Sequence, residues 1–369
     1  MDLSPDPLLA QLRRALRAGL AGAASRPAVR GVPVSDGPDS PARDVLADLG
    51  MPRCELPLAA GGLDLGLAVG VTVSEELGRA ACGNPYRAAA FTADAALACG
   101  RADVLGRLLA GATVAAAGLE ALPPGSAVAA RRAEAGWTLS GTVTVDAPGA
   151  DLAAVLTRIR GGPALALLPG RSAGLTWHPG RWPHVLELAG VPAGKPELLR
   201  RIEPPGGGAL TRAQVRQAAY LLGLAAGMHD AAVRYTGTRR QFGGPLRDLQ
   251  AVSFPLARAV VALRATRMLV YRAAWFADTG RPSTAPAEAL AAAAEALADI
   301  ARLCMQACGS RSMTSQLPLH RYYRLAAAEL VRYGRPAALW RLVGATAVAG
   351  CGAGTALAGT ALAGTALAG

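Results

Sequence analysis

The stretch RRQFGGPL at residues 239–246 separates two long segments in which apolar residues recur at helical spacing, 210–238 and 248–279. Its adjacent glycines and its proline predict a turn between two helices. Two further segments, 285–308 and 318–348, keep the same periodicity for twenty or more residues. Four long helices with short connections favour an antiparallel four-helix bundle in the C-terminal part of the chain.

The residues before the bundle follow a strand pattern. Residues 137–145 alternate between apolar and polar side chains, 153–159 have a β-rich composition, and 164–168 form a short apolar run. Pro- and Gly-containing turn signals separate these runs. The pattern predicts a central antiparallel β domain of short strands.

The first part of the chain returns to helical spacing, with apolar periodicity at 8–16 and helical runs at 71–82 and 87–99. The end of the chain repeats TALAG three times, a five-residue period that matches neither helix nor strand, and we expect a disordered tail there. These patterns predict an N-terminal helical domain at 1–110, the β domain at 111–205, the four-helix bundle at 206–350 and a low-complexity tail at 351–369.

The chain of 369 residues is 52% hydrophobic and 17% charged, which allows a large core and excludes a disordered chain or a small disulfide scaffold. The net charge of +12 comes from 38 basic residues against 26 acidic ones. Lys195 is the single lysine, so 37 of the 38 are arginines. Arginine in place of lysine, with abundant Ala, Gly and Pro, is typical of a GC-rich genome. We therefore read the basic residues as dispersed and expect no nucleic-acid partner.

Six cysteines are scattered along the chain, and Cys304 and Cys308, one helical turn apart, have no histidine at ligand spacing nearby. We therefore expect no metal site. The first twenty residues lack the basic end and apolar run of a signal peptide, and before the Ala-, Gly- and Thr-rich end of the chain no apolar stretch reaches eighteen residues without a charge. These features predict a soluble, cytoplasmic protein without a membrane span.

Several short motifs, in the right order over most of the chain, carry a resemblance to a known family. RRQFGGPL with Gln250 resembles the R-x-x-F-G-x-x-L…Q signature of acyl-CoA dehydrogenases. EELGR at 75–79, WTLSG at 137–141 and the segment 306–324 resemble further landmarks of that family. The resemblance implies an α+β multidomain fold with an N-terminal helical domain, a central β domain and a C-terminal four-helix bundle.

The resemblance also implies a cofactor, FAD, shared across a subunit interface. Arg239, Gln241 and Phe242 would contact the FAD diphosphate of a neighbouring subunit, and an arginine beside an amide suits a pyrophosphate chemically. The backbone at Gln306, Gly309 and Ser310 would approach the same cofactor. Without the resemblance, the residues allow another interpretation, in which Arg239 and Arg240 are solvated at a helix end and Phe242 packs in the hydrophobic core.

The family's reaction needs a carboxylate base, and this sequence lacks one at both usual positions. Nine residues beyond Arg324 lies Tyr333, whose phenol has an ordinary pKa of about 10, and 26 residues before Arg239 lies Ala213. Glu329 and Asp230 are weak candidates for a relocated base. Asp230 follows His229, but adjacent helix residues point about 100° apart, so they do not form one acid–base face.

The flavin-facing motifs of the family are also altered. Thr144, Val145 and Asp146 stand in place of W-I-T, the loop at 119–126 is one residue too long, and Gly309-Ser310-Arg311-Ser312 replaces a glycine-rich turn. The half-site that this chain would donate to a neighbour is therefore better retained than the half-site it would hold itself.

Three interpretations remain open. The first is a base-lacking subunit, similar to the smaller subunits of heteromeric acyl-CoA dehydrogenases that act on steroid side-chain thioesters, completed by a homologous glutamate-bearing partner in a dimer or tetramer. The second is a self-sufficient homo-oligomeric oxidoreductase, acting on an acyl group on CoA or a carrier protein with a relocated base. Both would pass electrons to an electron-transfer acceptor. The third is a flavin-free scaffold.

Overall fold

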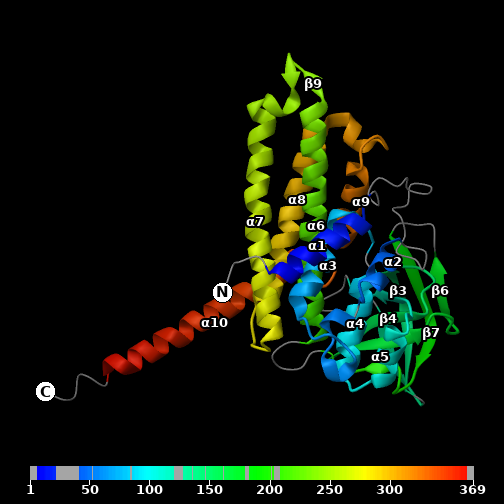
Figure 1. Ribbon diagram of the computed structural model, residues 1–369. Coiled ribbons are helices and arrows are strands. Elements are labelled where there is room, and N and C mark those ends of the chain that lie inside the picture. Colours follow the sequence, from blue (N-terminus) through cyan, green and yellow to red (C-terminus); the bar gives the residue numbers. More distant parts are fainter. Residues whose placement is uncertain are drawn as a thin grey trace.

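The computed structural model describes residues 6–21, 41–51, 53–83, 85–119, 128–134, 136–145, 147–160, 162–178, 183–200, 202 and 208–363. Along this part of the chain, helices come first, a β-sheet follows, and long helices complete the molecule (Figure 1). The predicted fold class is confirmed: an N-terminal helical region, a central sheet and a C-terminal helical bundle. No helix in these ranges is long and apolar enough to cross a membrane.

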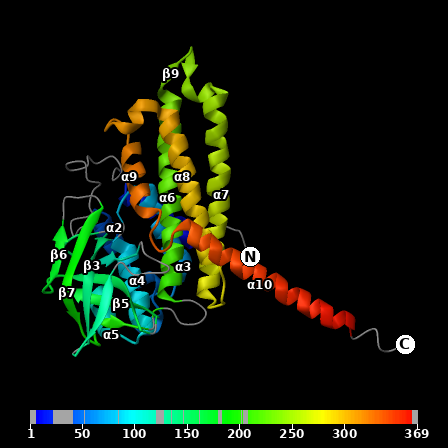
Figure 2. The same ribbon diagram turned by 180° about the vertical axis from the view of Figure 1, so that it is seen from behind.

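The N-terminal region packs between the sheet and the bundle in both views (Figures 1 and 2). Helix α3 contacts the first bundle helix, and α4 contacts both that helix and strand β1. The elements are α1 (Pro7–Gly19), α2 (Pro41–Asp48), η3 (Arg53–Glu55), η4 (Leu58–Ala60), α3 (Leu67–Arg79), α4 (Pro85–Ala98) and α5 (Ala102–Leu109).

The central sheet has the strand order β6-β7-β3-β1-β4-β5-β8, and β2 pairs with β3 beside this path. The prediction that it is antiparallel is wrong for one pair, because β1 and β4 run parallel, with Val114 opposite Leu152. Alternation of side chains shows which residues face the core but not which way the neighbouring strand runs. The strands are β1 (Val114–Ala117), β2 (Ala129–Ala133), β3 (Gly136–Val145), β4 (Leu152–Ile159), β5 (Gly162–Pro169), β6 (Leu175–His178), β7 (His184–Ala193) and β8 (Leu198–Leu199).

Three long helices form the bundle, as the sequence predicts: α6 (Ala209–Thr238), α7 (Gln250–Asp278) and α8 (Ala285–Cys308). A hairpin of β9 (Arg240–Gln241) and β10 (Gly244–Pro245), followed by η5 (Leu246–Asp248), joins α6 to α7 at one end of the bundle (Figure 1). At the same end, α8 continues into η6 (Gly309–Met313).

The fourth predicted helix, 318–348, is in fact two helices. Helix α9 (Leu319–Glu329) ends before Tyr333 and Gly334, which both have a positive φ (60° and 144°) that a continuous α-helix does not allow. Helix α10 (Pro336–Ala363) then leaves the body of the molecule in a new direction (Figures 1 and 2).

The structure also differs from the expected disordered tail, because α10 continues through the first TALAG repeats to Ala363. Alanine and leucine are strong helix formers, and an apolar period reports burial of one face rather than the capacity to form a helix. The last six residues, 364–369, lie outside the described residues.

Helices α3 and α6 cross at close range because glycines stand at the crossing. A Cβ atom on Gly78 would collide with the carbonyl oxygen of Tyr220, and a Cβ on Gly223 with the carbonyl oxygen of Glu75. The two backbones can therefore touch only while these positions lack a side chain. This contact fixes the N-terminal region against the bundle.

Candidate functional site

A pocket of about 480 Å³ opens at the end of the bundle that carries the β9–β10 hairpin. Its lining comes from the end of α6, the hairpin, the start of α7, the end of α8 and η6. All six residues predicted to meet a cofactor are among those that line it: Arg239, Gln241, Phe242, Gln306, Gly309 and Ser310. The structure thus brings together two segments that lie more than sixty residues apart in the sequence.

The hairpin is a tight turn that determines where Arg239 and Phe242 lie. The amide of Arg239 still donates to the carbonyl of Tyr235 (2.8 Å), and its carbonyl accepts from the amide of Leu246 (2.9 Å). Between them, Phe242 and Gly243 have φ values of 52° and 85°. Two successive left-handed residues are the geometry of a two-residue hairpin turn, for which glycine is favoured and phenylalanine is not.

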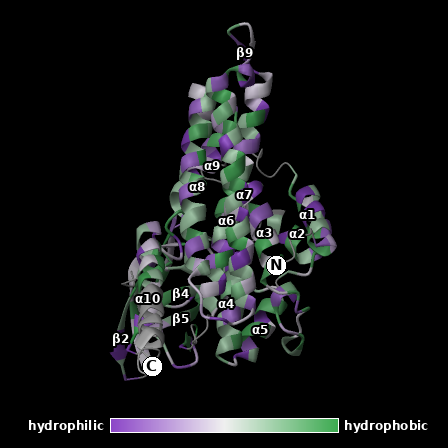
Figure 3. Cartoon of the chain, turned by 90° about the vertical axis from the view of Figure 1, so that its left-hand side faces the viewer, coloured by the Kyte–Doolittle hydropathy of each residue, from purple (hydrophilic) through white to green (hydrophobic). Residues whose placement is uncertain are grey.

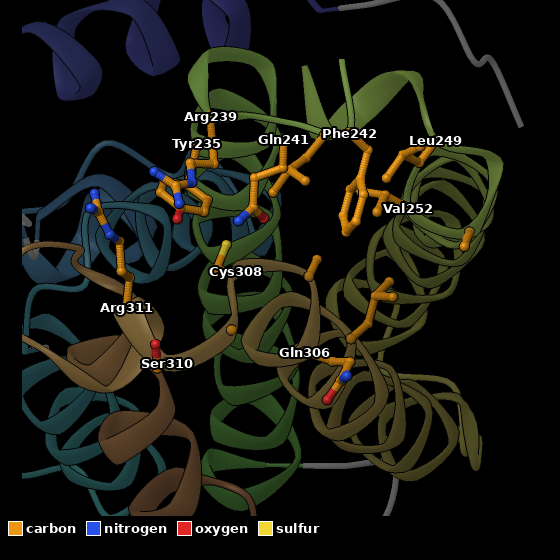
Figure 4. A pocket seen from close by; sticks show the side chains of 15 residues that line it. Tyr235, Arg239, Gln241, Phe242, Leu249, Val252, Gln306, Cys308, Ser310 and Arg311 are labelled. Carbon is orange, nitrogen blue, oxygen red and sulfur yellow. The ribbon is translucent and has the colours of Figure 1, made fainter. Parts of the chain in front are cut away.

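Phe242 does not fill a core, as the alternative from the residues alone would require, because its side chain is 84% exposed. Figure 4 shows its ring beside Val252, on the side of the pocket where α7 begins. A large aromatic side chain held in the open by a strained backbone position is available to cover a ligand or a second chain.

The opposite wall is formed where α8 ends. Gly309 has a φ of 59°, and the hydroxyl of Ser312 donates to its carbonyl at 2.6 Å. Ser310 and Arg311 lie across the pocket from Tyr235 and Arg239 (Figure 4).

The charged side chains that line the pocket are all positive. Arg239 and Arg311 contribute guanidinium groups, Gln241 and Gln306 contribute amides, and no Asp or Glu is among the lining residues. Such a set can bind a phosphate or pyrophosphate, since guanidinium and amide groups donate to its oxygens without a competing carboxylate. With Phe242 available to cover a planar ring, these residues fit the diphosphate end of FAD.

The two usual positions of the base are buried. Tyr333 is 2% exposed, and its ring packs edge-on against Phe91 with a centroid distance of 5.8 Å. Its amide donates to the carbonyl of Leu119 (3.1 Å), and its carbonyl accepts from Nε2 of Gln214 (3.0 Å). Ala213 is buried on α6. Neither position places a carboxylate, and the backbone at Tyr333 is held on both sides.

Glu329 is buried among positive charges. Its carboxylate pairs with Arg87 (2.9 Å) and Arg332 (3.6 Å) and accepts from Nε2 of Gln217 (3.1 Å). Burial would raise the pKa of Glu329, but Arg332, Arg87 and the amide of Gln217 together hold it below its usual value of 4.5. A base that removes a proton from carbon needs a raised pKa rather than a lowered one, so this setting suits a structural role.

The other base candidate, Asp230, forms an ion pair with Arg79 of α3. Its neighbour His229 turns the other way, with Nε2 3.0 Å from the carbonyl oxygen of Leu256 on α7. The two side chains therefore meet different helices, as their helical spacing predicts.

On the flavin side, β3 ends with Thr144 and Val145, and Val145 is fully buried. Asp146 and the loop residues 120–127 lie outside the described residues. Residues 309–313, which replace the glycine-rich turn, form η6. In the described ranges, no three His, Cys, Asp or Glu side chains lie close enough together to hold a metal ion.

Sequence reasoning missed a buried ion network that connects the N-terminal region to α6. Arg216 pairs with Glu55 (2.6 Å) and Asp94 (2.7 Å), and Arg212 pairs with the same two carboxylates and with Asp278. The only signal was the spacing of the two arginines, four residues apart on one helix face. Tyr235, which lines the pocket one turn before Arg239, was also missed, because nothing in its local sequence distinguishes it from other residues of the helix.

Comparison with known proteins agrees with this geometry. Residues 207–346 match the family model of the acyl-CoA dehydrogenase C-terminal domain. The rat short-chain specific acyl-CoA dehydrogenase (Rattus norvegicus), a mitochondrial protein, is 39% identical over 108 residues, 29% of this chain and 26% of that protein. The chain thus matches about a quarter of the length of this curated relative.

Solved structures resemble almost the whole chain. A variant of the steroid ACAD Tcur3481–Tcur3483 has a TM-score of 0.78 and 27% identity, covering 94% of this chain and 99% of that one. The ChsE4–ChsE5 complex from Mycobacterium tuberculosis has a TM-score of 0.75 and 21% identity, covering 94% and 99%. The second likeness is one of fold.

Proposed function

Because the chain belongs to the acyl-CoA dehydrogenase family, we propose that it is the base-lacking subunit of an FAD-dependent oxidoreductase that desaturates an acyl thioester. In this proposal it shares FAD with a homologous, glutamate-bearing partner and donates the pocket at the hairpin end of its bundle. The observation that carries the proposal is the contrast between that pocket, whose residues fit the cofactor, and the closed, carboxylate-free base positions.

The donated half-site rests on the pocket. Arg239 and Arg311 would neutralise the diphosphate, Gln241 and Gln306 would donate hydrogen bonds to it, and the exposed ring of Phe242 would cover the ligand. When bound, FAD supplies the acceptor for the hydride that leaves the acyl chain. The residues of this chain would bind and orient the cofactor, and the partner would provide the remaining contacts.

The proposal that this chain lacks the base is supported by the residues at and near the two usual base positions. Tyr333 and Ala213 occupy the two usual positions, and the lowered pKa of Glu329 argues against a relocated base there. Asp230 is compensated by Arg79. The proton of the thioester would therefore be removed by a glutamate of the partner, since in the described part of this chain neither the two usual positions nor Glu329 and Asp230 offer a carboxylate suited to the task.

The names of two solved neighbours support a pair of unlike chains. One is the complex of ChsE4 with ChsE5, and the other, at 27% identity, is the steroid ACAD Tcur3481–Tcur3483. We propose by analogy that the substrate is an acyl group carried on CoA or a carrier protein, and that a separate electron-transfer protein reoxidises the flavin.

The visible spectrum of the purified chain tests the proposal. We expect the chain alone to carry no flavin absorbance, and the same chain co-expressed with a glutamate-bearing homologue from the same genome to carry it. Arg239→Gln should reduce the flavin content of the co-expressed pair, because it removes a guanidinium from the pocket. Arg240→Gln is the matched control, since this neighbouring arginine is exposed and does not line the pocket.

Two results would contradict the proposal. Flavin bound to the chain alone, with turnover of a thioester, would favour a self-sufficient homo-oligomer with a base that this geometry does not reveal. A co-expressed pair without flavin would leave a flavin-free scaffold.

A further inference from the structure

Helix α7 carries a row of large apolar side chains that are about half exposed in the described part of the chain. Phe254, Val261, Met268 and Trp275 are 46–68% exposed, although each is a residue type that is usually buried. We call these four residues the α7 stripe. They stand seven residues apart, which places them within a narrow band along one face of the helix, about 32 Å long at ~1.5 Å per residue. Figure 3 faces this side of the molecule.

The α7 stripe is flanked by charges of one sign. Arg258 and Arg264 are exposed, and helical spacing places them on either side of the row. No Asp or Glu occurs between residues 250 and 277. Arg272 lies on the same face and already pairs with Glu288 of α8. The face therefore offers an apolar centre with two guanidinium groups that pair with no described carboxylate.

This charge pattern determines what can cover the face. A second copy of α7 would bring Arg258 and Arg264 against the same arginines, because the helix has no carboxylate to offer in return. Like charges across an interface suppress that pairing, whereas opposite charges favour it. The complementary surface is a helix with an apolar row flanked by Asp or Glu.

The position of the α7 stripe links it to the pocket. Ala251 lines the pocket, and Phe254, the first residue of the stripe, follows three positions later on the same side of the helix. At the other end of the stripe, α10 leaves the body on the side where α7 lies (Figures 1 and 2). A subunit that covers this face would reach the rim of the pocket.

We infer that the α7 stripe is the docking surface for an unlike, homologous subunit whose matching helix is acidic, and that Arg258 and Arg264 select this subunit over a second copy of the chain. The inference rests on the proposed function in taking the occupant to be a homologous subunit. The charge selection itself follows from α7 alone, and it can be tested without flavin or substrate.

The test uses the chain's own charge-reversed variant as the acidic probe. Arg258→Glu with Arg264→Glu creates the complementary face on an otherwise identical chain. Immobilised wild-type chain is titrated with the wild-type chain or with this variant, and the two dissociation constants are compared. We expect the mixed pair to bind at least about tenfold more tightly than the wild-type pair, and the gain to fall as salt is raised.

Two controls separate the face from general charge effects. Arg131→Glu with Arg132→Glu makes the same charge change on the exposed strand β2 and should leave the affinity unchanged. Val261→Glu in the immobilised chain should abolish the gain, because it interrupts the apolar row at its most exposed member. Circular dichroism checks that each variant is folded, which we expect because the altered side chains are exposed.

Three results would overturn the inference. The wild-type and mixed pairs could bind with equal affinity, the mixed pair could fail to associate, or the β2 control could give an equal gain. A charge-selective mixed pair combined with flavin-free co-expressed chains would uphold this inference while contradicting the proposed function. Flavin in the co-expressed pair without charge selection on α7 would support the proposed function and contradict this inference.

Discussion

Glu329 shows how a single residue can look like a catalytic candidate in the sequence and have a different setting in the fold. Its carboxylate compensates Arg87 and Arg332, which are both almost fully buried. Removing one member of a buried ion pair leaves its partner charged in a medium of low polarity. The residue therefore matters for stability whatever the chemistry of the complex.

Glu329→Gln should lower the free energy of unfolding by about 3 kcal/mol at neutral pH. The folded state lowers the pKa of Glu329, so its contribution is present above the usual value of 4.5 and is lost as the pH falls through the lower, folded value. The difference between variant and wild type should accordingly shrink at acid pH. Urea denaturation across this range measures it.

Asp299→Asn is the control for Glu329→Gln. This carboxylate pairs with Arg302 on the surface, and both side chains are about 70% exposed. An exposed pair of this kind contributes less than about 1 kcal/mol. A loss at Glu329 no larger than the loss at Asp299 would contradict a buried, stabilising role.

Among the elements, the crossing of α3 and α6 depends on the absence of side chains. Gly223→Ala should destabilise the fold by about 1–3 kcal/mol, because the added methyl group meets the backbone of α3, which cannot move aside like a flexible side chain. Gly344→Ala on α10 is the matched control. Nothing lies within 4 Å of a Cβ there, so the alanine should stabilise the helix by about 0.5–1 kcal/mol. Thermal unfolding of both variants compares them, and an equal response would show that the crossing is not tight.

At the scale of the whole molecule, the two unequal half-sites predict a flavin count. This chain would complete the cofactor site of its partner, whereas in its own half-site Thr144, Val145 and Asp146 stand in place of the family's flavin-facing motif. We therefore expect one FAD per pair of unlike chains. The ratio of flavin absorbance to protein concentration in the purified complex measures it. Two flavins per pair would mean that this chain holds a site of its own.

Much of the molecule follows from local patterns. Helical periodicity predicts α6, α7 and α8 to within a few residues, because long helices repeat the same spacing many times. The short motif at 239–246 predicts a turn and singles out Arg239, Gln241 and Phe242, which the structure places around one pocket with residues from the end of α8. The domain boundaries and the roles of these residues in binding remain predictions.

Other features depend on contacts between distant parts of the chain, and no local pattern reports them. The parallel pairing of β1 with β4 and the ion network of Arg212 and Arg216 each require a partner from another region. The lowered pKa of Glu329 is partly of the same kind: Arg332 is three residues away, but Arg87 lies 242 residues away and Gln217 lies 112 residues away. Local spacing sets which elements form and what they bury, whereas burial among distant charges sets whether a carboxylate can act as a base.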